Sequence, residues 1–189
     1  AKFMENCLQN MVNEKYGMDK LVITKSLRSG YKNPKQIAHK VLADRIGKRD
    51  PGNKPSVGDR VAYIYIDNPD KRALQGDRIE TPEFIKENKL KINYTFYITN
   101  QLMKPLQQVF ALVLENLAVF KRRHGPTLRK WKRELNKLRE EYPDDETYKK
   151  KEDALRNKEV KAVLFDEYLR QTNNMRLGNQ SITSFFNDV

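Results

Sequence analysis

The stretch "NYTFYITNQLMKPLQQVFALVLENL", residues 93–117, carries the strongest periodic pattern in the chain. Its apolar residues recur at steps of three and four, the spacing of one face of an α-helix. These positions are Tyr94, Tyr97, Ile98, Leu102, Leu106, Val109, Phe110, Val113, Leu114 and Leu117. The pattern predicts a long helix with this face in the core. Pro105 lies inside it and should kink it near Gln101, because proline lacks an amide donor and crowds the carbonyl four residues back.

Upstream, "KRDPGNKPSVGDRVAYIYI", residues 48–66, predicts a turn that leads into a strand. Asp50–Asn53 has turn chemistry, and Val61–Ile66 has the β-branched and aromatic content of a buried strand. Leu21–Thr24 is a second candidate strand, and Gln75–Glu80 is a short edge segment before a helix that starts at Thr81-Pro82. We therefore expect an α+β fold, mostly helical, with a small antiparallel β element.

Two more helices are predicted in the amino-terminal half. Residues 1–19 place Phe3, Cys7, Leu8, Met11 and Val12 on one side and should end near Gly17, a residue that favours helix C-caps. The second has Asn33 as N-cap and Pro34 at its first position, and Gly47 should close it.

After Phe120 the chain becomes highly charged, with sparse apolar residues at helical spacing. A break at Tyr142–Asp145 predicts a helical hairpin. The residues from Gln171 onward are polar and aperiodic. The expected organisation is an initial helix at 1–19, a main domain at 20–120, a charged helical extension at 121–172 and a flexible tail at 173–189.

Composition excludes several classes of protein. The chain has 189 residues, 38% of them hydrophobic, which is too many for a disordered polycation. A single cysteine, Cys7, rules out a disulfide framework or a thiolate cluster, and two distant histidines make a zinc site improbable. Apolar runs long enough to span a membrane are absent, as is a signal-peptide core, so we expect a soluble intracellular chain.

The positive charge is concentrated rather than spread. Residues 20–60 hold eleven Lys and Arg against three Asp, which is +8 of the formal net charge of +12. A local excess on a segment patterned to fold is typical of a phosphate-backbone binder. The alternatives are a solvated basic face and, less favoured, an anionic membrane surface, since no helix here pairs a basic face with a strongly apolar one.

Three blocks in a fixed order resemble the thumb of family B replicative DNA polymerases, the delta type most of all. They are "KLVITKSL", "KQIAHKVLADRIGKRDPGNKPSVGDRVAYIYI" and "INYTFYITNQLMKPL", between residues 20 and 106. The resemblance implies that residues 1–19 end the palm and that the chain is the thumb segment of a DNA-directed DNA polymerase, a nucleotidyltransferase. The family's catalytic aspartates lie in palm motifs that are absent here, so the segment alone should be inactive, with no catalytic or metal-binding residues of its own. Mg²⁺ and dNTP are expected at that absent palm, and no cofactor in this segment.

Cellular delta-type enzymes follow the thumb with cysteine-rich metal modules, which a chain with Cys7 alone cannot form. The charged extension stands in their place, a combination similar to polymerases of large DNA viruses. The resemblance implies action in a host cytoplasmic virus factory or the nucleus. Its implied partners are primer–template duplex, a sliding clamp and the rest of the polymerase chain, with no membrane.

Charge and resemblance together predict which residues hold DNA. They are Lys25, Lys32, His39, Lys40, Arg45, Lys48, Arg49, Arg60 and Tyr63. A basic turn with about six phosphate contacts gives a log–log salt slope of about −5. Asp50 and Asp59 should orient arginines or cap turns, and Gly58 should let the backbone approach closely. The competing interpretation of residues 48–60 is an ordinary structural hairpin.

The segment "NQSITSFF", residues 179–186, resembles a sliding-clamp interaction box. One 3₁₀ turn would bring Ile182, Phe185 and Phe186 to one side as an apolar plug, with Asn179 in place of the usual Gln. Alternatively, the two phenylalanines fold back on the helical extension.

Two other functions compete with a polymerase segment. One is a stand-alone DNA-binding and clamp-adaptor module without catalytic activity. The other is a nuclease, which is disfavoured because Asp144, Asp145 and Glu146 form a charged run at a turn without metal-binding spacing.

Overall fold

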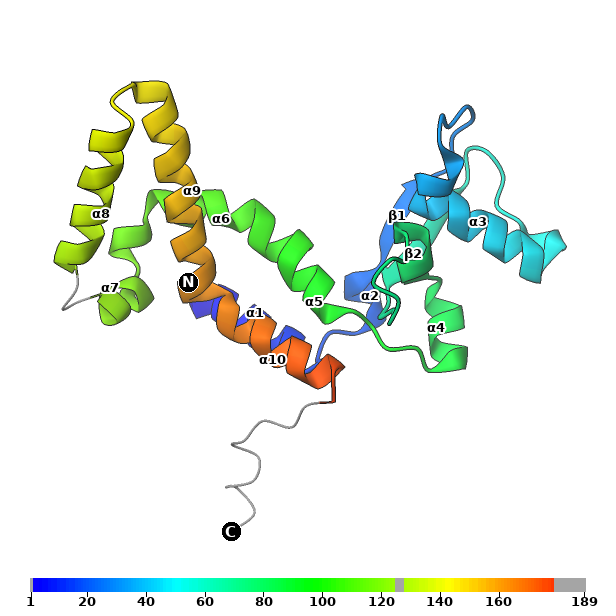
Figure 1. Cartoon of the computed structure of the whole chain (residues 1–189). Helices are drawn as coiled ribbons and strands as arrows, with labels where there is room; N and C mark the ends of the chain where they lie inside the picture. Colours follow the sequence, from blue (N-terminus) through cyan, green and yellow to red (C-terminus); the bar gives the residue numbers. More distant parts are fainter. Residues whose placement is uncertain (1, 125–127, 179–189) are drawn as a thin grey trace, which may run out of the picture. The chain divides into compact units, whose positions relative to one another are not determined.

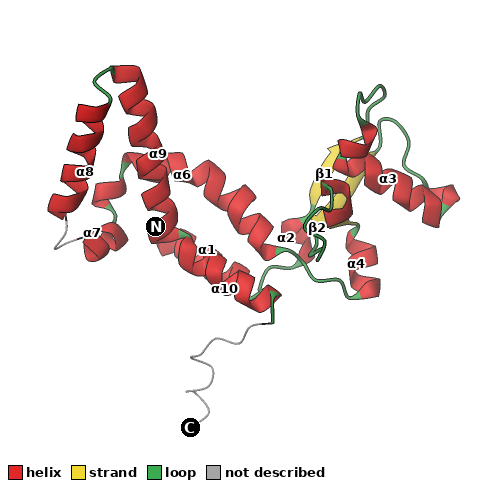
Figure 2. Cartoon of the chain, in the orientation of Figure 1, coloured by secondary structure: helices red, strands yellow, loops and turns green. Residues whose placement is uncertain are grey.

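The computed structural model describes residues 2–124 and 128–178, and it divides into two compact units. The mixed unit is Glu14–Tyr97, and the helical unit combines Ala1–Asn13 with Ile98–Val189. Helices dominate, and the strands form a three-stranded antiparallel sheet (Figure 2). The predicted fold class is confirmed.

The mixed unit is built on a sheet of order β1-β2-β3. β2 (Arg60–Tyr65) is the predicted central strand, and it pairs with β1 (Ile23–Ser26) so that Ser26 faces Arg60. β3 (Ile79–Glu80) covers its other edge. β1 begins at Ile23 rather than Leu21, because Leu21 still belongs to the short helix α2 (Met18–Leu21).

Helices and short 3₁₀ turns surround this sheet. They are α3 (Ala38–Arg49), α4 (Pro82–Asn88), α5 (Tyr94–Phe96), η1 (Pro34–Gln36), η2 (Pro51–Asn53) and η3 (Gln75–Arg78). α4 starts where predicted, with the Thr81 hydroxyl accepting from the Phe84 amide at 3.3 Å. Gly47 does not end α3, which continues to Arg49. One core cluster of the unit consists of Leu27, Leu42, Ala43, Val61, Tyr63 and Ile79.

A buried tyrosine ties β2 to the segment before β1. The Tyr97 hydroxyl donates to the Leu21 carbonyl at 2.8 Å and accepts from the Tyr65 amide at 3.0 Å. Tyr97 is only 3% exposed, so these bonds form away from water. The hydroxyl thereby provides a hydrogen-bond partner for one backbone group of α2 and one of β2.

The helical unit packs helices from both ends of the chain, and Figure 1 shows α1 beside α10 and α8 turning back into α9. Its elements are α1 (Lys2–Val12), a π-helical segment (Tyr97–Met103, mostly in this unit), α6 (Lys104–Leu112), η5 (Leu114–Asn116), α7 (Ala118–His124), α8 (Leu128–Glu141), α9 (Asp145–Leu164) and α10 (Asp166–Arg176). Fully buried Leu8, Phe120 and Phe165 anchor the core. The predicted hairpin break is confirmed, and Asp144 caps α9 by accepting from the Thr147 amide at 2.7 Å.

The long helix predicted over residues 94–117 is interrupted. A π-helical segment precedes Lys104, as expected for a helix that must accommodate a proline four residues after Gln101. Because a π turn rotates the residues that follow it, the predicted core stripe is shifted beyond Pro105. Val109 is 59% exposed and Val113 is 42% exposed, so both core assignments are wrong.

Three further predictions need correction. α1 ends at Val12 rather than near Gly17, because Glu14 adopts a left-handed conformation with φ of 53°. Phe3 is 82% exposed, whereas Met4, Leu8 and Val12 face the core. α10 continues to Arg176, beyond the predicted start of the tail. The predicted clamp-binding residues Asn179, Ile182, Phe185 and Phe186 lie outside the described residues.

Candidate nucleic-acid interface

A pocket of about 350 Å³ in the mixed unit gathers several of the predicted DNA-binding residues. We call it the basic pocket, and it is lined by Thr24, Lys25, Ser26, Arg28, Tyr31, His39 and Arg60. β1 contributes Thr24, Lys25 and Ser26, β2 contributes Arg60, and α3 contributes His39. Residues from across the predicted thumb thus meet at one place.

Backbone pairing at the start of β2 places Arg60 beside Ser26 of β1. The ladder continues past the strands, with the Leu27 amide donating to Asp59 O at 2.8 Å and the Gly58 amide donating to Leu27 O at 2.9 Å. Gly58 has a φ of +96°, which disfavours any residue with a Cβ. A Cβ at Gly58 would meet no other atom of the protein within 4 Å, and close approach of this backbone to DNA stays a prediction. Conformation, rather than space, requires glycine.

The side chains of the basic pocket are fixed by a chain of hydrogen bonds. The Arg28 amide donates to the Tyr31 hydroxyl at 2.8 Å, and that oxygen lies 3.0 Å from Nε2 of His39. Burial and the neighbouring charge of Lys25 lower the pKa of His39, against a hydrogen bond to the Ser26 backbone that raises it. The lowered pKa favours the neutral form of His39, whose Nε2 can accept from the Tyr31 hydroxyl.

The pocket's cations have no carboxylate partners. Among the described residues, Lys25, Arg28 and Arg60 are exposed and lie farther than 4.0 Å from any Asp or Glu oxygen. The same holds for Lys32, next to Tyr31, and for Lys48 in the last turn of α3. Uncompensated cations on a folded surface attract polyanions, and phosphate oxygens suit them.

Arg45 and Arg49, also predicted to bind DNA, have a buried partner instead. Glu80 is 2% exposed and accepts from both guanidinium groups at 2.7 Å. Arg45 also donates to Ile79 O at 3.1 Å, and Arg49 stacks 3.5 Å from the Phe84 ring centre. These two arginines hold α3 against β3, outside the basic pocket.

The remaining predicted residues are dispersed. Lys40 pairs with Asp44 one helical turn away, and Tyr63 is 5% exposed within the core. Burial, with the neighbouring Tyr65, raises the pKa of Tyr63 to about 12. Tyr63 therefore contributes packing and no charge near neutral pH.

The two aspartates of the basic turn do cap backbone, as predicted. Asp50 accepts from the Gly52 amide at 3.1 Å, and Asp59 accepts from the Ser56 amide at 2.8 Å. Both carboxylates stabilise the loop that leads to Arg60.

Sequence reasoning did not identify Arg28 and Tyr31 as site residues, although both lie in the basic segment. Arg28 follows β1 in an irregular loop, and Tyr31 precedes η1, so no helical or strand periodicity links them to His39. The only available signal was the local excess of Lys and Arg around an isolated tyrosine.

Neither a group of metal-binding side chains nor a membrane-spanning helix occurs among the described residues. Across residues 2–124 and 128–178, no three His, Cys, Asp or Glu side chains come close enough together to hold a metal ion. Within the same ranges, none of the helices has the length and apolar character needed to cross a membrane.

Comparison with known proteins identifies the family. Residues 1–113 match the profile of DNA polymerase family B. The DNA polymerase of Pyramimonas orientalis virus is 46% identical over 187 residues, which is 97% of this chain and 15% of the viral protein. The DNA polymerase of Acanthamoeba polyphaga mimivirus is 45% identical over 119 residues, 60% of this chain and 7% of that protein.

A cellular relative matches a similar portion. The DNA polymerase delta catalytic subunit of Schizosaccharomyces pombe is 39% identical over 117 residues, 59% of this chain and 10% of the subunit. The chain thus spans a small part of each of these relatives. Because the family profile covers more than half of its length, the chain belongs to DNA polymerase family B.

Proposed function

We propose that this chain is the thumb segment of a viral replicative DNA polymerase and that its mixed unit grips primer–template duplex. The observation that carries the proposal is the basic pocket, where Lys25, Arg28 and Arg60 surround the Tyr31–His39 pair without carboxylate partners. Membership of family B makes DNA the natural polyanion for this surface.

Phosphate contacts suit the task of a polymerase thumb. They are strong, independent of base sequence and equivalent at every step along the duplex, so the enzyme can hold its product and still advance. Lys32 and Lys48 would extend the contact beyond the pocket. His39 would orient the Tyr31 hydroxyl, which can itself donate to a phosphate when His39 becomes protonated.

The nucleotidyl-transfer chemistry belongs to the palm in this proposal. The segment would contribute grip, and Mg²⁺ and dNTP would be bound by the rest of the polymerase chain, in a virus factory or the nucleus of the host. A palm-containing fragment mixed with this chain should then regain processive synthesis. A stand-alone clamp adaptor would instead bind DNA and clamp without restoring polymerase activity.

Tethering to a sliding clamp is the second part of the proposal. The segment Asn179–Phe186 supplies an aliphatic residue and two aromatics at the spacing of a clamp-binding box. Such a plug would keep the polymerase on DNA while the phosphate grip slides.

Duplex binding by charge-neutral variants tests the grip. The triple variant Lys25→Gln, Arg28→Gln and Arg60→Gln should bind duplex at least about tenfold more weakly, because three phosphate contacts are removed. Fluorescence anisotropy with a labelled duplex of about 20 base pairs measures this.

A matched control removes equal charge elsewhere in the mixed unit. Lys71, Arg72 and Lys86 are exposed and lie outside the basic pocket, so their replacement by Gln should change affinity far less. Equal losses in the two triple variants would show that net charge, and not the pocket, holds DNA.

A further inference from the structure

The helical unit carries a second concentration of positive charge. Between residues 121 and 139 the sequence holds nine Lys and Arg and one acidic residue, Glu134. The density exceeds that of residues 20–60, which hold eleven Lys and Arg in 41 residues. Most of these cations lie on α8, whose first ten residues include five of them.

The cations of α8 lie opposite its buried side. Arg129, Arg133 and Lys137 are four residues apart, so they form one row along the helix. Trp131 lies two residues from Arg129, about 200° around the helix, and is 3% exposed. Its ring contacts Phe120 of α7, with centroids 5.6 Å apart, and its Nε1 donates to Glu115 at 3.2 Å. Packing of Trp131 therefore fixes which way the cationic row faces.

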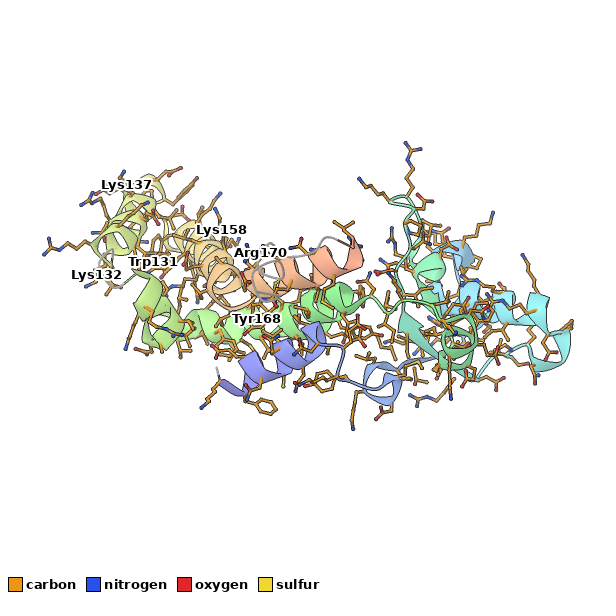
Figure 3. The ribbon with its side chains drawn as sticks, turned by 90° about the horizontal axis from the view of Figure 1, so that it is seen from below. Trp131, Lys132, Lys137, Lys158, Tyr168 and Arg170 are labelled. Carbon is orange, nitrogen blue, oxygen red and sulfur yellow. The ribbon has the colours of Figure 1, made fainter. Side chains whose placement is uncertain are left out.

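These side chains point into solvent and have no carboxylate partners. Figure 3 shows Lys132 and Lys137 projecting away from the α8 ribbon. Among the described residues, none of the five cations Arg129, Lys130, Lys132, Arg133 and Lys137 has an Asp or Glu oxygen within 4.0 Å. We call these five residues the α8 basic face.

The neighbouring helix shows what an ordinary solvated face looks like here. α9 mixes acids and bases along its length, and several form ion pairs, with Lys150 2.7 Å from Glu146 and Arg156 2.8 Å from Glu152. In α8 the cations stand together and its other acids, Glu140 and Glu141, come at the end of the helix. α8 therefore differs from α9 because its cations are grouped together and are not paired with acids.

The chemistry of the face points to duplex nucleic acid. A membrane-surface helix needs a free apolar side, but Trp131 and Leu135 of α8 pack in the core of the unit. Single strands are held by stacking on aromatic rings, and the α8 basic face contains none. From Arg129 to Lys137 the row extends about 12 Å, enough to face several phosphates of one duplex.

We propose that the α8 basic face is a second binding surface for the phosphate backbone of double-stranded DNA. It lies beyond residues 1–113, which match the family profile, so it adds to the thumb grip. In a chain whose mixed unit already holds duplex, a second phosphate surface would lengthen the bound DNA and slow its release.

The test compares three variants of the full 189-residue chain, each lacking three charges. The α8 variant is Arg129→Gln, Arg133→Gln and Lys137→Gln, and the control in the same unit is Lys150→Gln, Lys158→Gln and Arg170→Gln. The third is the basic-pocket triple variant. Duplex affinity is measured between about 50 and 200 mM salt, and each fold is checked by thermal unfolding.

The α8 variant should bind duplex about tenfold more weakly than the control, with a log–log salt slope shallower by about 3. A variant with Arg129→Lys and Arg133→Lys keeps the charge and should bind like the unmodified chain, which excludes loss of folding as the cause. Loss of duplex affinity in the α8 variant but not in the basic-pocket variant would support the α8 basic face as a binding surface and refute the thumb grip.

Three outcomes would overturn the proposal. One is an α8 variant that binds duplex as well as its control does. Another is a loss confined to oligo-dT, which would indicate a single-strand site. The third is a loss confined to vesicles containing phosphatidylserine, which would assign the face to a membrane.

Discussion

Glu80 and Arg45 form an ion pair in which Oε1 lies 2.7 Å from Nη1, with the carboxylate side chain 3% exposed. Arg49 reaches the same oxygen at 2.7 Å from the last turn of α3. Burial alone would raise the pKa of Glu80, but the hydrogen bonds and charges of Arg49 and Arg45 lower it further than burial raises it. Glu80 therefore stays ionised and joins α3 to the edge of the sheet.

Replacement Glu80→Gln should lower the free energy of unfolding at pH 7 by about 2 kcal/mol, since it leaves two guanidinium groups without their carboxylate. The figure is below that for a fully buried pair because the arginines are 23% and 36% exposed. Urea unfolding measures the loss, and the exposed Glu83→Gln serves as control.

The effect of Glu80 should also depend on pH in one direction. Because the pKa of Glu80 is lowered in the folded protein, the ion pair makes its full contribution to the free energy of unfolding at pH values above the ordinary carboxyl pKa. That contribution is lost as the pH falls through the lowered pKa of the folded state. The difference between the unmodified chain and Glu80→Gln should therefore shrink in acid. A difference that stays constant down to pH of about 2 would contradict the ion-pair explanation.

His39 should make duplex binding sensitive to mild acid. Its pKa is lowered in the free protein by burial and by Lys25, and a phosphate placed in the basic pocket would raise it again. Binding would then take up a proton, so affinity should rise as pH falls below about 6.5. His39→Gln should remove most of that rise and leave affinity near pH 7.5 almost unchanged, as measured by anisotropy. An undiminished rise in the variant would place DNA away from His39.

Loss of the Tyr97 hydroxyl should destabilise the mixed unit. Tyr97→Phe leaves the Tyr65 amide and the Leu21 carbonyl without their partner, at a cost of about 1–3 kcal/mol. Tyr94→Phe is the matched control, because the Tyr94 hydroxyl has no hydrogen-bond partner among the described residues. Equal midpoints of thermal unfolding for the two variants would show that the Tyr97 bonds contribute nothing net.

The clamp-binding proposal predicts a separable defect. Phe185→Ala with Phe186→Ala should abolish binding to a sliding clamp, because the apolar plug is lost, and should spare duplex binding. Surface plasmon resonance with immobilised clamp measures the first, and anisotropy measures the second. Undiminished clamp affinity in the double variant would refute the assignment of Asn179–Phe186.

Sequence patterns predicted those elements whose signals are local. β2, the Thr81 cap of α4 and the break before α9 follow from strand composition and turn chemistry within a few residues. Val109 and Val113 were misplaced because a π-helical segment shifts the helical register, and periodicity read at a constant step cannot detect that. The side of α1 on which Phe3 lies was predicted wrongly, because a single apolar residue at the edge of an apolar helix face can point either to the core or to solvent.

The sequence analysis named some of the residues that line the basic pocket and missed others. Local charge identified Lys25, His39 and Arg60, which the sheet then brings together. Arg45 and Arg49 looked equivalent to them, since nothing in the sequence signals that Glu80, more than thirty residues away, becomes their buried partner. Which residues pair across such separations in sequence is determined by the fold.

The central claim is that the mixed unit grips duplex through phosphates, and the salt dependence of binding by the unmodified chain tests it most directly. Five unpaired cations, Lys25, Arg28, Lys32, Lys48 and Arg60, give an expected log–log slope of about −4 or steeper, the same for duplexes of unrelated sequence. A slope near zero, or affinity that depends on base sequence, would contradict the account.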